Sequence, residues 1–336
     1  MKEFCMIQTV FCCQKRPKDK REYLFDNYRV LLIILVVIGH FIEPSVNNNP
    51  YLYELKWAIV AFHMPAFIFI SGYFSKQIPS LFKMIKSLVI PYFAYEIIYY
   101  LLYVLVLDKS TGLYLARPKF TLWYLMALFA WRLLAPLVRR IPFHMPLALL
   151  GGLLIGFTEL GNFLSIPRIV YFFPFFLAGM EFDSSCLTKF RTRKGYAGAL
   201  AFIGAFTIFL FTDKSHHSLS HKIFYGRYSS TDLELGAAEG VLIRLICYGI
   251  SFLLVYMFML VLPSEKKPYS YLGQRTMAIY IFHGIIYSCL KYRTTILASV
   301  QSNFEVLLLI AFCIGLVFVL ASRPFVAITN KIANLI

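Results

Sequence analysis

The sequence predicts an all-α, polytopic integral membrane protein with about ten transmembrane helices. Of its 336 residues, 59% are hydrophobic and only 15% are charged, which is outside the range of soluble globular domains. Apolar runs of membrane-crossing length also recur along the chain, between charged or turn-forming residues. The expected helices cover residues 28–45, 55–75, 84–107, 121–137, 144–159, 167–181, 195–212, 241–262, 276–291 and 304–323.

These helices are expected to form one transmembrane domain, residues 28–325, between an N-terminal arm (1–27) and a C-terminal tail (326–336). In the arm a short apolar patch precedes the basic residues, which is the reverse of the order in a cleaved signal peptide. The seven cysteines show no pattern typical of a disulfide framework.

The distribution of basic residues predicts an orientation. With the N-terminus in the cytoplasm, 20 Lys and Arg residues fall on the inner side and 10 on the outer side. This bias predicts a plasma-membrane protein with both termini cytoplasmic. It also explains the net charge of +16 without nucleic-acid binding, because no soluble basic face carries interleaved aromatics. The ten outer residues are Lys56, Lys109, Arg117, Lys119, Arg168, Lys214, Lys222, Arg227, Lys291 and Arg293.

The first predicted helix carries the main functional signal. Arg29 and His40 are eleven residues apart, so they project from one helix face, about 16 Å apart along the axis. Asp26 lies one turn before Arg29. An ionisable side chain at the depth of His40 usually faces a cavity or a partner and marks a functional site. The alternative is a structural histidine bonded to a neighbouring helix.

Two further histidines and two other polar side chains are expected in the membrane. His63 lies in the second helix, where Pro65 breaks the helix and Ser71 begins a small-residue pair. His283 lies in the ninth helix, and Trp123 lies at the outer end of the fourth. We predict that His63, Ser71, Trp123 and His283 contact a substrate in a polar cavity. For Trp123 the alternative is an interfacial aromatic belt.

Basic residues cluster on the predicted cytoplasmic side. Lys83 and Lys86 share one helix face, and Arg139, Arg140 and the RTRK run at 191–194 belong to two other loops on that side. Such a cluster suits a polyphosphorylated cytosolic cofactor. Topological anchoring explains Lys83 and Lys86 equally well.

The longest outer loop, about 213–240, contains His216, His217 and His221 together with acidic residues. Their spacing matches no established metal-ligand pattern. We therefore expect no metal site, and a solvated loop near a substrate.

Five segments occur in an order that resembles a known family. They are Asp26-x-x-Arg29 followed by His40, SGYF at 71–74, LWYL at 122–125, FFPFFLAGM at 172–180 and YLGQRTMAIYIFH at 271–283. Together they resemble the membrane-bound acyltransferase family 3, and within it the fucose 4-O-acetylase-like proteins. Many relatives have two arginines where this chain has Lys83 and Lys86, which keeps the charge but loses the forked geometry.

The resemblance implies transfer of an acyl group, most often acetyl, from cytosolic acyl-coenzyme A to a hydroxyl of a sugar or envelope glycan. His40 is then the expected base. Arg29 holds a coenzyme A phosphate or orients the thioester carbonyl, and Asp26 positions Arg29. Lys83, Lys86, Arg139 and Arg140 are the other expected donor contacts. Acetyl-coenzyme A, the glycan and the lipid bilayer are thus the expected partners.

The competing class is a transporter that uses these arginine and histidine side chains as a proton or substrate pathway. Such a protein would need paired broken helices in two related halves. The sequence shows no internal repeat.

Overall fold

The computed structural model describes residues 22–334, and this part of the chain consists of helices and loops without β-strands. A helix lies at each of the ten predicted positions, with bounds that differ by a few residues. The α-helices are α2 (Tyr23–Phe41), α3 (Pro50–Val60), α4 (His63–Tyr73), α5 (Leu81–Met84), α6 (Ile90–Leu101), α7 (Trp123–Val138), α8 (His144–Leu154), α9 (Ile166–Glu181), α10 (Cys186–Phe190), α11 (Arg193–Thr212), α12 (Ala237–Val261), α13 (Thr276–Arg293), α14 (Asn303–Leu320) and α15 (Arg323–Ala333).

Short 3-10 and π-helical segments join these helices. A π-helix, η3 (Ile85–Val89), connects α5 to α6, and a second, η4 (Leu102–Val106), extends α6. The 3-10 segments that matter for the site are η2 (Glu43–Ser45), η7 (Ser215–Ser218), η8 (His221–Tyr225) and η10 (Ser270–Gln274).

The helices identify a multi-pass membrane protein. Seven helical segments of the described chain are long and apolar enough to cross a bilayer, whereas α7 and α8 are apolar but shorter. Ten crossings therefore stay a prediction. The seven segments are Tyr23–Phe41, Pro50–Tyr73, Leu81–Val106, Phe163–Glu181, Arg193–Thr212, Ala237–Val261 and Asn303–Leu320.

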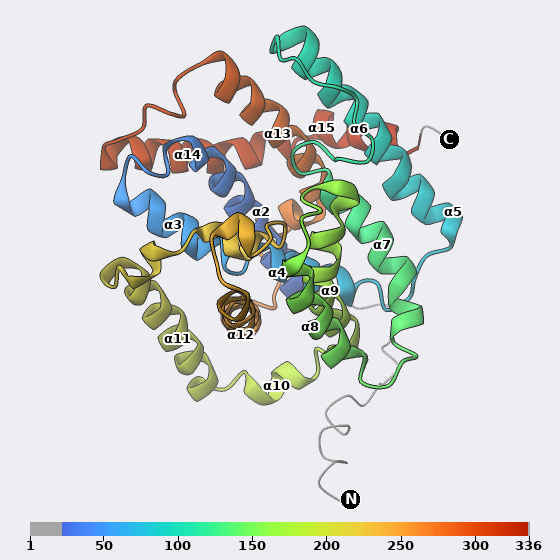
Figure 1. Cartoon of the computed structure of the whole chain (residues 1–336), viewed down its shortest axis with the longest axis vertical. Helices are drawn as coiled ribbons and strands as arrows, with labels where there is room; N and C mark the ends of the chain where they lie inside the picture. Colours follow the sequence, from blue (N-terminus) through green and yellow to red (C-terminus); the bar gives the residue numbers. More distant parts are fainter. Residues whose placement is uncertain (1–21, 335–336) are drawn as a thin grey trace, which may run out of the picture.

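The first helix occupies the middle of the molecule. Figure 1 shows α2 and α4 near the centre of the view, with α6, α11 and α14 toward the edge. The most apolar window of α2 is 72% buried within the protein, compared with 11% for α11. Protein therefore surrounds α2, and its polar side chains face other helices or an internal space rather than lipid.

The start of α2 is fixed by the segment that precedes α13. The Asn27 side chain donates hydrogen bonds to the carbonyl oxygens of Pro263 (2.8 Å) and Glu265 (2.9 Å). Gly273 in η10 lies directly against α2, because a Cβ there would be 2.1 Å from the Asp26 carbonyl oxygen. Only glycine permits this approach, which holds the Asp26–Arg29 turn in place.

Two glycines bring α4 and α9 into contact. A Cβ on Gly72 would lie 2.0 Å from the Phe176 carbonyl oxygen, and a Cβ on Gly179 would lie 1.9 Å from that of Phe69. Each glycine thus receives the backbone of the opposite helix, as small residues do where membrane helices pack closely. This contact positions the side chains of α4 that face α2.

The helix predicted over residues 55–75 is broken, as Pro65 predicts. α3 ends at Val60 and α4 begins at His63. Pro65 has no N–H to donate to the Ala61 carbonyl, four residues earlier. The Ser251 hydroxyl donates to this oxygen instead, with an Oγ–O distance of 2.5 Å. The break makes His63 the first residue of α4.

The edges of the transmembrane domain differ from those predicted. α2 begins at Tyr23, so residues 23–27 of the predicted arm are helical. α15 covers residues 323–333 and packs on α13 and α6, so most of the predicted C-terminal tail is helical as well. Residues 1–21 of the predicted arm lie outside the described residues.

Candidate functional site

A cavity of about 640 Å³ extends along α2. Its lining includes Arg29 near the start of this helix and Glu43 just after its end. These residues are fourteen positions apart, which corresponds to roughly 20 Å of helix. Five residues predicted from the sequence line the cavity: Arg29, His40, His63, Ser71 and Trp123.

The Arg29 end of the cavity is built from α2, α4 and α7. Arg29 Nη1 lies 3.8 Å from Asp26 Oδ1, and the guanidinium carbon lies 4.3 Å from the centre of the Phe74 ring. Asp26 is buried. The ion pair and the ring hold the guanidinium at this end.

A second arginine lies at the Arg29 end. Arg132 lines the cavity, and its Nε donates a hydrogen bond to Ser75 Oγ at 3.0 Å. Nearby, Ser71 Oγ and the Tyr124 hydroxyl are hydrogen-bonded at 2.5 Å. Arg132 was not among the predicted site residues. A charged residue inside an apolar helix is nevertheless a signal of function.

The Arg29 end lies on the side of the molecule that carries the segments around residues 191 and 265. Asn27 is bonded to carbonyls at 263 and 265, and Arg191 Nη2 donates to the carbonyl oxygens of Met259 (2.7 Å) and Leu262 (2.8 Å). These are segments that the basic-residue count assigns to the cytoplasm.

His40 lies between the two ends in a group of rings. Its ring centre is 4.6 Å from that of Phe120, 5.4 Å from His283 and 6.0 Å from Tyr287. His40 faces the cavity, whereas His283 is fully buried and is not part of the lining. The structure therefore places His283 behind His40, where it can act on His40 but does not reach the cavity.

Two histidines have one proton position fixed by the backbone carbonyl four residues earlier. His63 Nδ1 lies 2.7 Å from the Ile59 carbonyl oxygen, and His283 Nδ1 lies 2.9 Å from that of Ile279. A carbonyl oxygen can only accept, so Nδ1 carries the proton in both rings. Nε2 of a neutral His63 is thus an acceptor in a residue that lines the cavity. His283 Nε2 is buried without a hydrogen-bond partner.

The Glu43 end is organised around an ion pair between Glu43 and the buried Lys56. Lys56 Nζ also donates to the Gly39 carbonyl oxygen at 2.7 Å, and the Tyr225 hydroxyl donates to Glu43 Oε2 at 3.5 Å. Burial alone would raise the pKa of Glu43, but the charge and hydrogen bond of Lys56 lower it below its usual value. Glu43 is therefore a carboxylate at neutral pH.

The loop between α11 and α12 forms part of the wall at the Glu43 end. Phe224, Tyr225, Arg227 and Tyr228 of this loop line the cavity. Gly226 has φ of +63°, and a Cβ there would lie 2.4 Å from Tyr171 Cδ1. The sequence therefore has glycine where the loop turns sharply against α9.

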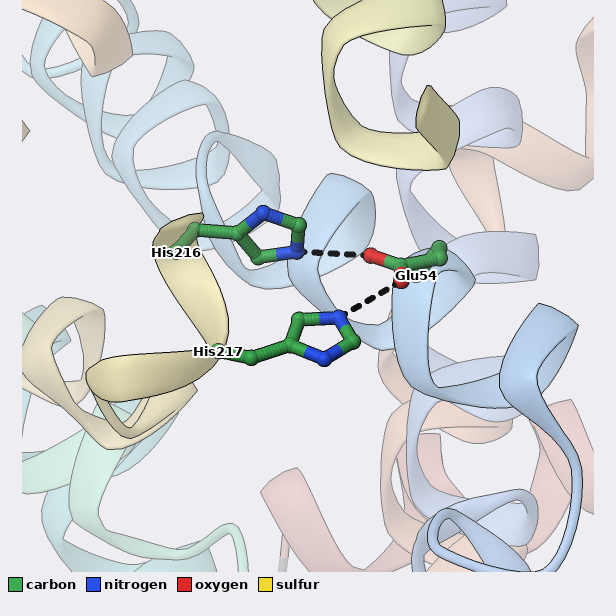
Figure 2. Close-up of side chains that lie close together, drawn as sticks. All are labelled: Glu54, His216 and His217. Atoms are coloured by element: carbon green, nitrogen blue, oxygen red, sulfur yellow. Dashed lines mark hydrogen bonds and ion pairs between the residues drawn. The ribbon is translucent and has the colours of Figure 1, made fainter. Parts of the chain in front are cut away.

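The same loop is attached to α3 by a buried carboxylate. Figure 2 shows His216 and His217 pointing toward Glu54. His216 Nε2 lies 2.7 Å from Glu54 Oε2, and His217 Nε2 lies 2.8 Å from Oε1. We call Glu54, Lys214, His216 and His217 the loop clasp. His216 is buried, so the expectation of a solvated loop is wrong at this residue.

The loop clasp has the side-chain types of a zinc site, because its two imidazoles and its carboxylate offer ligand atoms within 4.8 Å of one another. However, Lys214 Nζ lies 2.6 Å from Glu54 Oε1. An ammonium group on the same carboxylate opposes the binding of a second cation. We therefore interpret the cluster as a hydrogen-bonded attachment of the loop.

His221, the first residue of η8 in the same loop, is a buried and neutral side chain. Burial and the nearby positive charge of Lys56 together lower its pKa from 6.5 to about 4. Its ring centre lies 5.7 Å from that of Tyr225. His221 thus supports the tyrosine that contacts Glu43.

Comparison with known proteins agrees with this geometry. The family model described as an acyltransferase domain matches residues 22–322, which include both ends of the cavity. The chain belongs to the acyltransferase 3 family. It is therefore a multi-pass membrane protein of this family.

One curated protein is similar to a segment of this chain. A stretch of 58 residues is 41% identical to nodulation protein NolL from Sinorhizobium fredii (strain NBRC 101917 / NGR234). The match spans 16% of this chain and 16% of NolL. No solved structure is significantly similar to the chain.

The other predicted donor contacts of this family member lie away from the cavity. Lys83, Arg139 and Arg140 are exposed, Lys86 is half-buried, and none of the four lines the cavity. Arg139 Nε lies 3.7 Å from Glu181 Oε1. Within the cavity, the cations at the Arg29 end are instead Arg29 and Arg132.

Proposed function

We propose that this acyltransferase moves an acyl group, specifically acetyl, from cytosolic acyl-coenzyme A to a hydroxyl of a sugar or cell-envelope glycan. The observation that supports this proposal is the single cavity that joins the Arg29 end to the Glu43 end, with His40 between them. A donor and an acceptor that enter from opposite ends can meet at His40 in an orientation suited to reaction. The protein acts in the plasma membrane, with both termini and the Arg29 end on the cytoplasmic side.

His40 is the general base in this proposal. One ring nitrogen takes the proton of the acceptor hydroxyl while its oxygen attacks the carbonyl carbon of the thioester. The tetrahedral intermediate collapses, the C–S bond breaks, and the coenzyme A thiolate recovers the proton from His40. The buried Nε2 of His283 is an acceptor close to the His40 ring. It is suited to receive an N–H from His40, which would leave the other nitrogen of His40 free to act as the base.

The donor occupies the Arg29 end. Asp26 positions Arg29, and Arg29 and Arg132 supply positive charge where the thioester enters the cavity. In this proposal the nucleotide phosphates of coenzyme A lie outside the cavity and contact the basic cluster on the same predicted side. The proposed contacts outside the cavity are Lys83, Lys86, Arg139 and Arg140.

The acceptor occupies the Glu43 end and reaches His40 from that side. His63 and Trp123 line the cavity and are the proposed acceptor contacts. Ser71 lies at the Arg29 end, bonded to Tyr124. Its proposed contact is therefore with the donor rather than the acceptor.

The experiment is transfer of label from [acetyl-¹⁴C]acetyl-coenzyme A to envelope glycans in vesicles that contain the purified protein. We expect label in the glycan fraction, none with His40→Ala, and a matching loss of acetyl groups in glycans from cells that lack the protein. If labelled sugar instead crosses sealed vesicles without acyl-coenzyme A, and no acetyl group is transferred, the transporter alternative holds.

A further inference from the structure

Four cations line the Glu43 end of the cavity. They are Lys56, Arg168, Arg227 and Lys291. Glu43 is the one carboxylate among the residues that line the cavity, and it is paired with Lys56. Three positive charges at this end are therefore left without a carboxylate partner in the cavity.

These three cations are held in place by neutral groups. The Arg168 guanidinium lies 4.8 Å from the Trp123 ring centre, and its Nη1 donates to Asn162 Oδ1 at 2.8 Å. The Arg227 guanidinium lies 4.8 Å from the Tyr228 ring centre. An aromatic face or an amide oxygen fixes the position of a cation without cancelling its charge.

Lys291 follows the same pattern. Its Nζ lies 5.5 Å from the Tyr287 ring centre and 5.6 Å from that of Tyr292. Across the described residues, no Asp or Glu forms an ion pair with Lys291, Arg168 or Arg227.

Three other basic residues on the same predicted outer side form ion pairs with carboxylates. Lys119 pairs with Glu96 at 2.9 Å, Lys214 with Glu54 at 2.6 Å and Arg293 with Asp108 at 2.5 Å. None of these three lines the cavity. These three outer cations outside the cavity thus have carboxylate partners, whereas Arg168, Arg227 and Lys291 inside it have none among the described residues.

We propose that the Glu43 end is an anion-binding subsite, and that the acceptor carries a carboxylate or phosphate group beside the hydroxyl that is acylated. This inference rests on the proposed function, because it assigns the Glu43 end to the acceptor. The chemistry that fits is an acidic sugar or a sugar phosphate.

The arrangement favours an anion over a neutral sugar for an electrostatic reason. Arg168 and Arg227 bring like charges to the same end of the cavity, and a negative group bound there offsets their mutual repulsion. Guanidinium groups also bind carboxylate and phosphate oxygens in a forked geometry. Because the subsite is partly buried, its charges are screened less than those on the surface.

The test is calorimetric titration of the purified full-length protein, without donor, with three probes of one size class. They are methyl β-glucuronide, glucose 1-phosphate and the neutral methyl β-glucoside. We expect at least one anionic probe to bind about tenfold or more tightly than the neutral one. The tighter of the two anions distinguishes an acidic sugar from a sugar phosphate as the source of the charge.

Arg227→Gln provides the variant, since this side chain is half-buried and replacing it leaves no cavity in the core. We expect it to weaken the preferred anion about tenfold and to leave the neutral sugar unchanged. Lys222→Gln is the matched control, because Lys222 lies in the same loop, is exposed and does not line the cavity. It should change the anion affinity less than twofold.

Equal affinity for charged and neutral probes would overturn the proposal, as would failure of both anions to bind or equal effects of the two variants. A loss of acetyl-coenzyme A affinity in Arg227→Gln would also overturn it, because this end would then hold the donor. The proposed function fails separately: loss of acetyl transfer with a retained anion preference would refute the reaction and not the subsite.

Discussion

At the Arg29 end the cavity is walled by packed helices, whereas the Glu43 end is completed by a loop. Arg29, Ser71 and Arg132 come from α2, α4 and α7. Tyr225, Arg227 and Tyr228 come from the segment between α11 and α12, which Glu54 attaches to α3. Elements built from helices hold one geometry, while loops accept sequence change more easily. Under the proposed function, the donor binds against packed helices and the acceptor against a loop, so we expect sequence changes in the loop to alter acceptor specificity.

The largest effect is expected at His40, which both ends share. His40→Ala should lower kcat by about 100- to 10,000-fold, which is the usual contribution of a general base. Membrane insertion should be unchanged, because alanine is the strongest helix former. His144→Ala is the control, since His144 is bonded to Glu181 at 2.5 Å and does not line the cavity. Near-normal turnover by His40→Ala would remove it from the reaction.

The next effect separates the two ends. Arg29→Gln should raise KM for acetyl-coenzyme A by roughly 10- to 100-fold, because charge-assisted contacts in a partly dry site are worth about 1.5–3 kcal/mol. KM for the acceptor should stay within twofold. Arg117→Gln, an exposed arginine away from the cavity, is the control. An increase in the acceptor KM alone would reverse the assignment of the ends.

A smaller effect is expected from the basic residues outside the cavity. Replacing Lys83 and Lys86 together by glutamine should raise the donor KM about tenfold if they bind the nucleotide phosphates. Lys189→Gln, another exposed lysine, provides the control. If the two lysines are only topological anchors, the double variant will insert poorly while the inserted molecules keep a normal donor KM.

The smallest effect concerns the loop clasp. Glu54→Gln keeps the shape of the side chain but removes the charge that Lys214 and the two histidines contact. We expect the acceptor KM to rise about three- to tenfold and the donor KM to stay constant. Removing a buried hydrogen-bonded charge weakens the attachment of the loop between α11 and α12. Glu234→Gln, exposed in the same loop, is the control.

Treatment of the wild-type protein with a metal chelator should leave both constants unchanged. A selective rise in the acceptor KM after chelation, reversed by zinc, would show that the loop clasp is a metal site.

The Arg29 end could be predicted from the sequence because its signals are local. The spacing of Arg29 and His40 on one helix places both on the cavity, and Pro65 explains the break that precedes α4. Arg132 could have been added on the same reasoning, since it is a charge within an apolar helix.

The Glu43 end depends on contacts between distant parts of the chain, which single-sequence patterns do not encode. Glu54 and His216 are 162 positions apart. Arg168, Arg227 and Lys291 belong to three separate segments, and none of them alone indicates a shared site. Their convergence on one cavity depends on helix packing. Likewise, His283 has a polar side chain in an apolar helix, but no pattern shows that it lies behind His40 rather than in the cavity.

The proposal that donor and acceptor reach His40 from opposite sides of the membrane is tested most directly in sealed proteoliposomes. The orientation of the protein is determined by labelling introduced cysteines with an impermeant thiol reagent. Cysteines at Asn48 and Ser218 are expected outside and one at Thr192 inside; all three positions are exposed. Acetyl-coenzyme A and a glycan acceptor are then supplied on chosen sides and acetyl transfer is measured. We expect transfer only when the donor is on the Thr192 side and the acceptor on the opposite side. Equal transfer with both substrates on one side, or with the donor on the Ser218 side, would contradict it.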